Sequence, residues 1–192
     1  MQELHELIRR EDAARALHLL QAAGLAPKGF LLFHPTSRWL FKAWTESRNA
    51  QILRRLTADG HRIVVTAAPD AREKAIVGRI LAEAAVPVTD LSGQLSLREL
   101  AAVAANARLF FGVDSAPMHI AAAMGTPVVA LFGPSSEKVW GPWRVPHRIV
   151  TSDDPCRPCG NDGCGGGKVS ECLTLLPVER ALSAINELLA HP

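Results

Sequence analysis

Several common signals are missing from this chain of 192 residues, and each absence narrows what the protein can do. The formal net charge is only +2 and the basic residues are dispersed, which argues against nucleic-acid binding. No uncharged apolar run reaches about 18 residues, so the sequence predicts no membrane span. The N-terminal stretch is charged from Glu3 onward and lacks the apolar core of a signal peptide. We therefore expect a cytoplasmic protein.

The motifs of several large enzyme classes are also absent. There is no Gly-x-Gly-x-x-Gly and no Gly-x-x-x-x-Gly-Lys-[Ser/Thr], which disfavours dinucleotide-dependent oxidoreductases and P-loop proteins. No Ser-His-Asp or His-Glu-x-x-His pattern and no internal repeat is found either. Any chemistry must therefore come from residues that these motifs do not describe.

The cysteines are confined to one short segment. They follow the spacing Cys156-x2-Cys159-x4-Cys164-x7-Cys172, a local arrangement rather than a disulfide framework for the whole fold. The surrounding stretch CGNDGCGGGK (159–168) predicts a mobile loop. Four soft ligands could hold zinc or an iron–sulfur cluster, although the spacing is not that of a zinc ribbon. Reduced thiols or adventitious disulfides are the alternatives.

What the chain does contain is a regular alternation of apolar strands and capped helices. Strands are predicted at 30–34, 62–68, 86–91, 108–113, 127–133 and 147–152. Helices are predicted at 2–23, 45–59, 70–85, 96–106, 115–124 and 177–190. Strands that are apolar on both faces and alternate with helices form parallel sheets covered on both sides. We predict an α/β fold with a doubly wound parallel sheet of about six strands.

The junction after the fourth strand interrupts an apolar run with Asp114-Ser115-Ala116-Pro117. In open parallel sheets, ligands bind where the carboxyl ends of strands meet helix N-termini. Ser115 and Ala116 offer backbone N–H groups at such a positive helix end, which suits an anion. Asp114 would repel a phosphate, so it either faces sugar hydroxyls or caps the helix. His119, one turn on, either approaches the ligand or serves only the structure.

The first strand ends in a second junction, HPTSRWLFKAW (34–44). Thr36 and Ser37 supply hydroxyl groups there, and Arg38 and Lys42 supply positive charge. A pyrophosphate needs this combination, because cations must offset its charge before it is buried. A solvated surface loop is the alternative.

A third junction, FGPSSEKVWGPW (132–143), follows the fifth strand. Ser135 is predicted to cap a short helix there. Trp140 and Trp143 either line a cleft or pack at the edge of the core. The residues alone thus predict a domain that binds a nucleotide or a sugar phosphate.

In combination, the junctions resemble glycosyltransferase family nine, the lipopolysaccharide heptosyltransferases. The resemblance rests on HPTSRWLFKAW, TAAPDAREK, CRPCG and above all FFGVDSAPMHIAAAMGTPVVALFG, which is most similar to members that add the third, branching heptose of the inner core. It begins near Gly29 and implies the Rossmann-like C-terminal half of a two-domain GT-B fold. Residues 1–28 would then be a linker helix, and residues 29–192 the nucleotide-sugar-binding domain with its Cys/Gly-rich loop at 153–172.

The resemblance also implies roles for individual residues. The donor-binding residues that it implies are Thr36, Ser37, Lys42, Glu73, Leu95, Asp114, Ser115, Ala116 and His119. Lys42 and Asp114 would take part in catalysis, at the diphosphate and at the heptose respectively. Glu73, in preference to Asp70, would approach the ribose, and Leu95 would pack on the adenine. Family members often have glycine in place of Ala116, so a close backbone approach to the donor is less certain there.

The implied reaction is an inverting transfer of heptose from ADP-heptose to the lipopolysaccharide core, with no metal required. The family's acceptor site and general base lie in an N-terminal domain that this chain does not resemble. We therefore expect donor binding with negligible transfer by the chain alone, in the cytoplasm and at most peripheral to the inner membrane. Two alternatives are open: another GT-B-like sugar-nucleotide enzyme, or a non-catalytic half that needs a partner domain.

Overall fold

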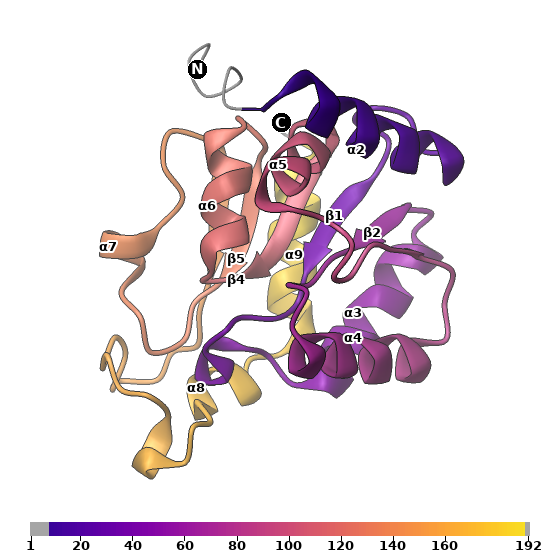
Figure 1. Cartoon of the computed structure of the whole chain (residues 1–192). Coiled ribbons are helices and arrows are strands. Elements are labelled where there is room, and N and C mark those ends of the chain that lie inside the picture. Colours follow the sequence, from indigo (N-terminus) through magenta and orange to yellow (C-terminus); the bar gives the residue numbers. More distant parts are fainter. Residues whose placement is uncertain (1–7, 191–192) are drawn as a thin grey trace.

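A parallel sheet forms the centre of the structure, which is a computed structural model and describes residues 8–190. Its strands are β1 (Leu31–His34), β2 (Ile63–Val65), β3 (Thr89–Asp90), β4 (Leu109–Val113), β5 (Val128–Leu131) and β6 (His147–Val150). They lie in the order β3-β2-β1-β4-β5-β6, and every neighbouring pair is parallel. Helices cover both faces of the sheet (Figure 1). The predicted doubly wound α/β fold is confirmed.

Most helices begin where their capping residues predict. The longer ones are α2 (Arg10–Ala22), α3 (Glu46–Ala58), α4 (Ala71–Ala84), α5 (Leu97–Asn106), α6 (Ala116–Ala123) and α9 (Val178–Ala190). The hydroxyl of Thr45 accepts a hydrogen bond from the Arg48 N–H at 3.2 Å, and Ser96 and Glu99 form a complete capping box. The short helix α7 (Glu137–Trp140) follows Ser136, which makes no side-chain cap bond. The prediction that Ser135 caps this helix is wrong.

The first helix packs onto the domain. The predicted range was 2–23, of which residues 1–7 lie outside the described part of the chain. Within α2, Ala16 and Leu20 are buried, and the Arg15 guanidinium donates a hydrogen bond to Glu99 of α5 at 2.5 Å. This bond is the main reason that the pKa of Glu99 lies below its ordinary value. The role of residues 1–28 as a linker between two domains stays a prediction.

The core has one apolar cluster on each face of the sheet, because neighbouring strand residues point to opposite sides. Phe33 and Phe111 stack with ring centroids 5.2 Å apart in the cluster under α3, α4 and α9. Leu32 and Phe110 belong to the other cluster, under α2, α5 and α6. With both faces covered, these strands can present polar side chains only at their ends. None of the described helices is long and apolar enough to cross a membrane.

The cysteine segment contacts the rest of the domain at several points. The Arg157 guanidinium donates a hydrogen bond to the Gly133 carbonyl at 2.7 Å, and the Gly160 N–H donates to the Pro134 carbonyl at 2.9 Å. Farther along, the Ser170 hydroxyl donates to the Phe41 carbonyl at 2.6 Å. The segment also contains two short helices, η2 (Cys164–Gly166) and α8 (Glu171–Thr174). Of the three contacts to other segments, only that of Gly160 lies within 159–168, and the mobility of that stretch stays a prediction.

Candidate functional site

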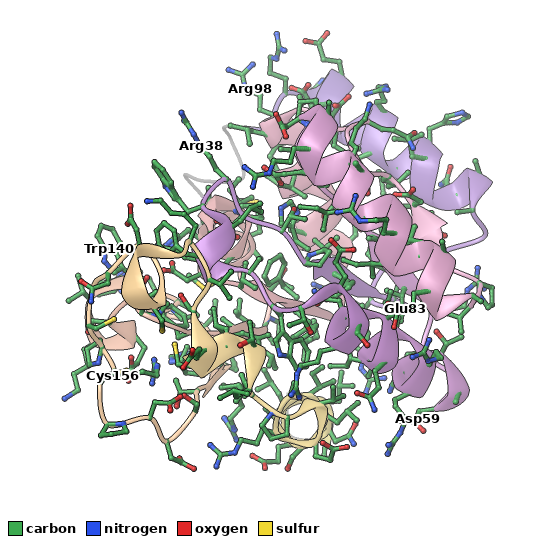
Figure 2. All side chains as sticks on the ribbon, turned by 90° about the horizontal axis from the view of Figure 1, so that it is seen from below. Arg38, Asp59, Glu83, Arg98, Trp140 and Cys156 are labelled. Carbon is green, nitrogen blue, oxygen red and sulfur yellow. The ribbon has the colours of Figure 1, made fainter. Side chains whose placement is uncertain are left out.

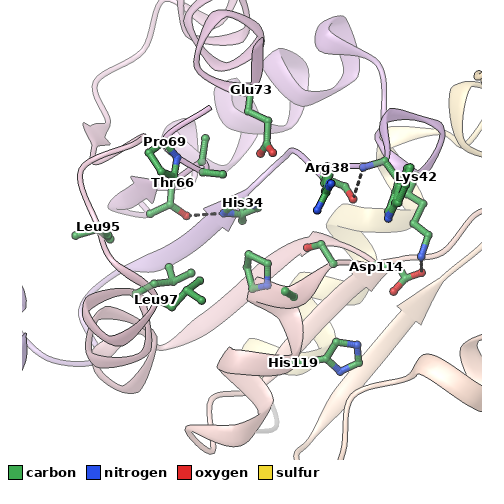
Figure 3. Close-up of a pocket in the computed structure, with 18 of the residues that line it drawn as sticks. His34, Arg38, Lys42, Thr66, Pro69, Glu73, Leu95, Leu97, Asp114 and His119 are labelled. Atoms are coloured by element: carbon green, nitrogen blue, oxygen red, sulfur yellow. Dashed lines mark hydrogen bonds and ion pairs between the residues drawn. The ribbon is translucent and has the colours of Figure 1, made fainter. Parts of the chain in front are cut away.

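A cavity of about 490 Å³ opens at the carboxyl edge of the sheet, among the segments that follow β1, β2, β3 and β4, with Trp140 from the segment after β5 (Figure 3). Most of the residues implied by the family resemblance line it, as do others from the same junctions. The implied residues found there are Ser37, Lys42, Glu73, Leu95, Asp114, Ser115, Ala116 and His119. These residues come from four segments far apart in the sequence, which therefore meet around one cavity.

Lys42 and Asp114 form an ion pair at one end of this cavity. Lys42 ends the short helix η1 (Leu40–Lys42), and Asp114 follows β4. The Lys42 Nζ lies 2.6 Å from Asp114 Oδ2, and the Asp114 side chain is only 6% exposed. The helix N-cap is Ser115, which makes no side-chain cap bond, so the interpretation of Asp114 as the cap is wrong. The buried carboxylate is instead neutralised by the lysine.

Glu73 projects into the cavity from the first turn of α4. Its Oε2 accepts a hydrogen bond from the Thr36 hydroxyl at 2.6 Å. Thr36 is fully buried and is absent from the cavity lining, so its hydroxyl holds Glu73 and does not face a ligand in this structure. Asp70 accepts bonds from the N–H groups of Arg72 and Glu73 as the cap of α4 and does not line the cavity. Of the two acids, only Glu73 lines the cavity.

His34 lines the cavity and was missed by the sequence analysis. It is the last residue of β1, and its Nδ1 lies 3.0 Å from the Thr66 hydroxyl oxygen. Burial lowers the pKa of His34 to about 4, so the ring is neutral near neutral pH. The only sequence signal for His34 was its position at the carboxyl end of a predicted strand.

The two ends of the cavity differ in chemistry. Pro69, Leu95 and Leu97 lie at one end, and Lys42, Asp114 and His119 at the other, with Glu73 between them (Figure 3). The cavity also meets the first residues of α6, where backbone N–H groups have no partner within the helix. Such a site fits an elongated ligand with a flat apolar end and an anionic, hydroxyl-rich end.

The two tryptophans of the third junction have different surroundings. Trp140 lines the cavity, as one of the two interpretations proposed. Trp143 is 72% exposed and lies beneath the Arg144 guanidinium, 5.3 Å from the ring centroid. It therefore neither lines this cavity nor packs at the edge of the core.

The cysteines do not form a metal site in the described part of the chain, where no group of three or more His, Cys, Asp or Glu side chains is placed to hold a metal ion. Cys156, Cys159 and Cys164 are exposed as free thiols, whereas Cys172 is buried. Burial raises the pKa of Cys172 to about 11. The zinc or iron–sulfur alternative at these cysteines stays a prediction.

Comparison with known proteins shows the family of the chain. The family model "Glycosyltransferase family 9 (heptosyltransferase)" matches residues 3–169. Lipopolysaccharide heptosyltransferase 3 of Escherichia coli is 39% identical over 125 residues, covering 65% of this chain and 36% of that protein.

Solved structures show the same fold. The glycosyl transferase family 9 protein of Veillonella parvula superposes with a TM-score of 0.81 at 23% identity, over 96% of this chain and 53% of that one. Heptosyltransferase WaaC of E. coli, solved with ADP-2-deoxy-2-fluoro heptose, gives 0.64 at 21% identity, over 90% and 47%. The chain thus spans about half the length of these solved relatives.

Proposed function

The chain belongs to glycosyltransferase family 9, the heptosyltransferases, and from this premise we propose that it is the ADP-heptose-binding half of a lipopolysaccharide core heptosyltransferase. The observation that carries the proposal is the two-ended cavity, with apolar side chains at one end and the Lys42–Asp114 pair at the other. A nucleoside diphosphate sugar has the same order of chemistry: a flat base, a ribose, a diphosphate and a sugar.

The nucleoside would occupy the apolar end. The adenine would pack on Leu95 and Leu97, since an aromatic base loses little by leaving water for an apolar wall. The ribose hydroxyls would donate to the Glu73 carboxylate, which the bond from Thr36 holds in position. This arrangement favours a nucleotide with free ribose hydroxyls.

The diphosphate would lie at the polar end. Lys42 supplies a cation, and Ser115 and Ala116 supply N–H groups at the start of α6. His119 lies on the same side of the cavity (Figure 3). Asp114 would accept hydrogen bonds from hydroxyl groups of the heptose, because a carboxylate repels phosphate but accepts from neutral donors.

The transfer would invert the anomeric carbon. An acceptor hydroxyl of the lipopolysaccharide core attacks that carbon, the bond to the β-phosphate oxygen breaks, and ADP leaves. The hydroxyl proton would pass to a carboxylate base, which we propose lies in an N-terminal half of the enzyme. Lys42 and the α6 N-terminus stabilise the charge that develops on the departing ADP. The same premise supports a reaction at the cytoplasmic face of the inner membrane.

Calorimetry with ADP-heptose, ADP, a UDP-sugar and a GDP-sugar tests the proposal. We expect ADP-heptose to bind, and Lys42→Met to weaken its binding about 10- to 100-fold, since a hydrogen bond to a charged group contributes about 1.5–3 kcal/mol. The matched control is Lys74→Met, because Lys74 is exposed on α4 and lines none of the described cavities. Binding of the UDP-sugar alone would point to another sugar-nucleotide enzyme and overturn the proposal.

A further inference from the structure

A second cavity, of about 470 Å³, adjoins the nucleotide cavity. Lys42 and Trp140 line both, so the two cavities meet where the diphosphate end of the first is proposed to lie. The other walls of the second cavity are Phe41, residues 134–136 of the turn after β5, and residues 158–161 of the cysteine segment. Neither the family match nor the proposed donor site assigns an occupant to it.

The walls of this cavity are fixed by contacts between segments. The Arg157 side chain is only 7% exposed; besides its bond to the Gly133 carbonyl, it pairs with Glu137 at 3.3 Å. The bond from the Gly160 N–H to the Pro134 carbonyl joins the two walls directly. Figure 2 shows Trp140 and Cys156 on the same side of the molecule, away from Asp59 and Glu83. The cavity is therefore built by the fold and does not depend on one loop alone.

Its chemistry matches a sugar ring. Ser135 and Ser136 supply hydroxyl groups, and Asn161 supplies an amide, so neutral donors and acceptors are both present. Trp140 and Phe41 add aromatic surface that can cover the apolar face of a pyranose. Among the described lining residues Lys42 alone is charged, which disfavours a second anion and favours a neutral polyol.

We propose that this second cavity is a saccharide subsite that adjoins the diphosphate end of the donor site. The proposal rests on the proposed function, because it needs the donor in the first cavity. Both reacting sugars must meet at the bond that breaks beside Lys42, so the occupant is either the sugar of the donor or the saccharide that receives it. Both present the same chemistry, a ring bearing hydroxyl groups.

Cys159 provides the readout, because its thiol is exposed and lines the second cavity. Cys156 and Cys164 are exposed but lie outside both cavities and serve as internal controls. Alkylation of each thiol by iodoacetamide is followed by peptide mass spectrometry on the whole chain, in buffer, ADP, ADP-heptose, or ADP with a deacylated inner-core oligosaccharide. When the protecting sugar ligand is present at about four times its Kd, mass action predicts that Cys159 is alkylated about fivefold more slowly than with ADP alone. The alkylation rates of Cys156 and Cys164 should not change.

Two variants connect protection to the proposed contacts. Ser135→Ala and Asn161→Ala should each reduce the protection of Cys159 at least about threefold while leaving the Kd for ADP unchanged, since lost hydrogen bonds contribute about 1 kcal/mol each. Asn186→Ala is the matched control, because Asn186 is exposed on α9 outside both cavities. Thermal melting checks that each variant is folded.

The outcomes separate the two sources and the two proposals. Protection by ADP-heptose without oligosaccharide identifies the donor sugar as occupant, and protection only by ADP with oligosaccharide identifies the acceptor. If ADP binds but neither sugar ligand slows Cys159 beyond ADP alone, the saccharide subsite is refuted while the nucleotide site stands. If neither ADP nor ADP-heptose binds, the proposed function and the subsite are both refuted.

Discussion

The Lys42–Asp114 pair gives the sharpest test of the site, because removing the lysine leaves a buried carboxylate without its cation. The Asp114 side chain is 6% exposed, and the Lys42 side chain is 21% exposed. Removing one partner of a fully buried pair costs about 3–5 kcal/mol, and partial access of water to Lys42 reduces this to about 2–3 kcal/mol. For a chain of this size, that loss lowers the melting temperature by about 4–12 °C.

The experiment compares Lys42→Met, which keeps the length of the side chain, with the double variant Lys42→Met/Asp114→Asn. Urea unfolding at neutral pH measures the free energy of unfolding of both, and of Asp114→Asn, to complete a double-mutant cycle. The double variant should regain most of the stability that the single lysine variant loses, because no charge is then left unpaired. If Lys42→Met is as stable as the original chain, or if the double variant is as unstable as the single one, the argument from charge is refuted.

Three further outcomes are expected. Asp114→Asn should lower the Kd for ADP and bring it nearer to the Kd for ADP-heptose, and calorimetry with both ligands measures this. Gly112→Ala should lower the free energy of unfolding by about 1–3 kcal/mol, because its Cβ would lie 2.7 Å from the His34 carbonyl oxygen; the control Gly78→Ala, on open helix surface, should raise it by up to about 1 kcal/mol. Folding lowers the pKa of His34 from 6.5 to about 4, so between these pH values the unfolded chain binds a proton that the folded chain excludes. The free energy of unfolding should therefore fall by about 3 kcal/mol as the pH drops from above 6.5 to below 4. A His34→Asn variant should lack this component in urea titrations at successive pH values, and an unchanged pH profile would contradict it.

The fold could be predicted because its signals are local. Each strong strand is a short apolar run, and Thr45, Asp70 and Ser96 cap the helices that follow, as their side-chain bonds show. The weakest prediction was the strand at 86–91, which forms pairs only at Thr89 and Asp90. An edge strand interrupted by Pro87 carries little periodicity, so its length could not be read from the pattern.

The partners within the site could not be predicted, because they depend on strand order. Lys42 and Asp114 are 72 positions apart, and they meet because β1 and β4 pair with His34 opposite Gly112. Thr36 was given a ligand-binding role because a hydroxyl at a strand end suits a phosphate. The same hydroxyl also suits Glu73, which the start of α4 brings within 2.6 Å. Sequence reasoning brought these residues to one edge of the sheet but could not choose between these partners, and their roles toward a ligand stay predictions.

An acid at the end of the cavity where we propose that the diphosphate binds needs a physical reason, and the pairing of Asp114 with Lys42 supplies one. Without a ligand, the pair keeps this end of the cavity electrically balanced, so neither charge is left unpaired. In the proposed site, a diphosphate would compete with Asp114 for the lysine, and this competition would weaken the binding of ADP. A sugar attached to the diphosphate would give Asp114 hydroxyl donors in return, which would offset the competition. On this proposal the acid would favour ADP-heptose over ADP, and a chain without that carboxylate should distinguish the two poorly.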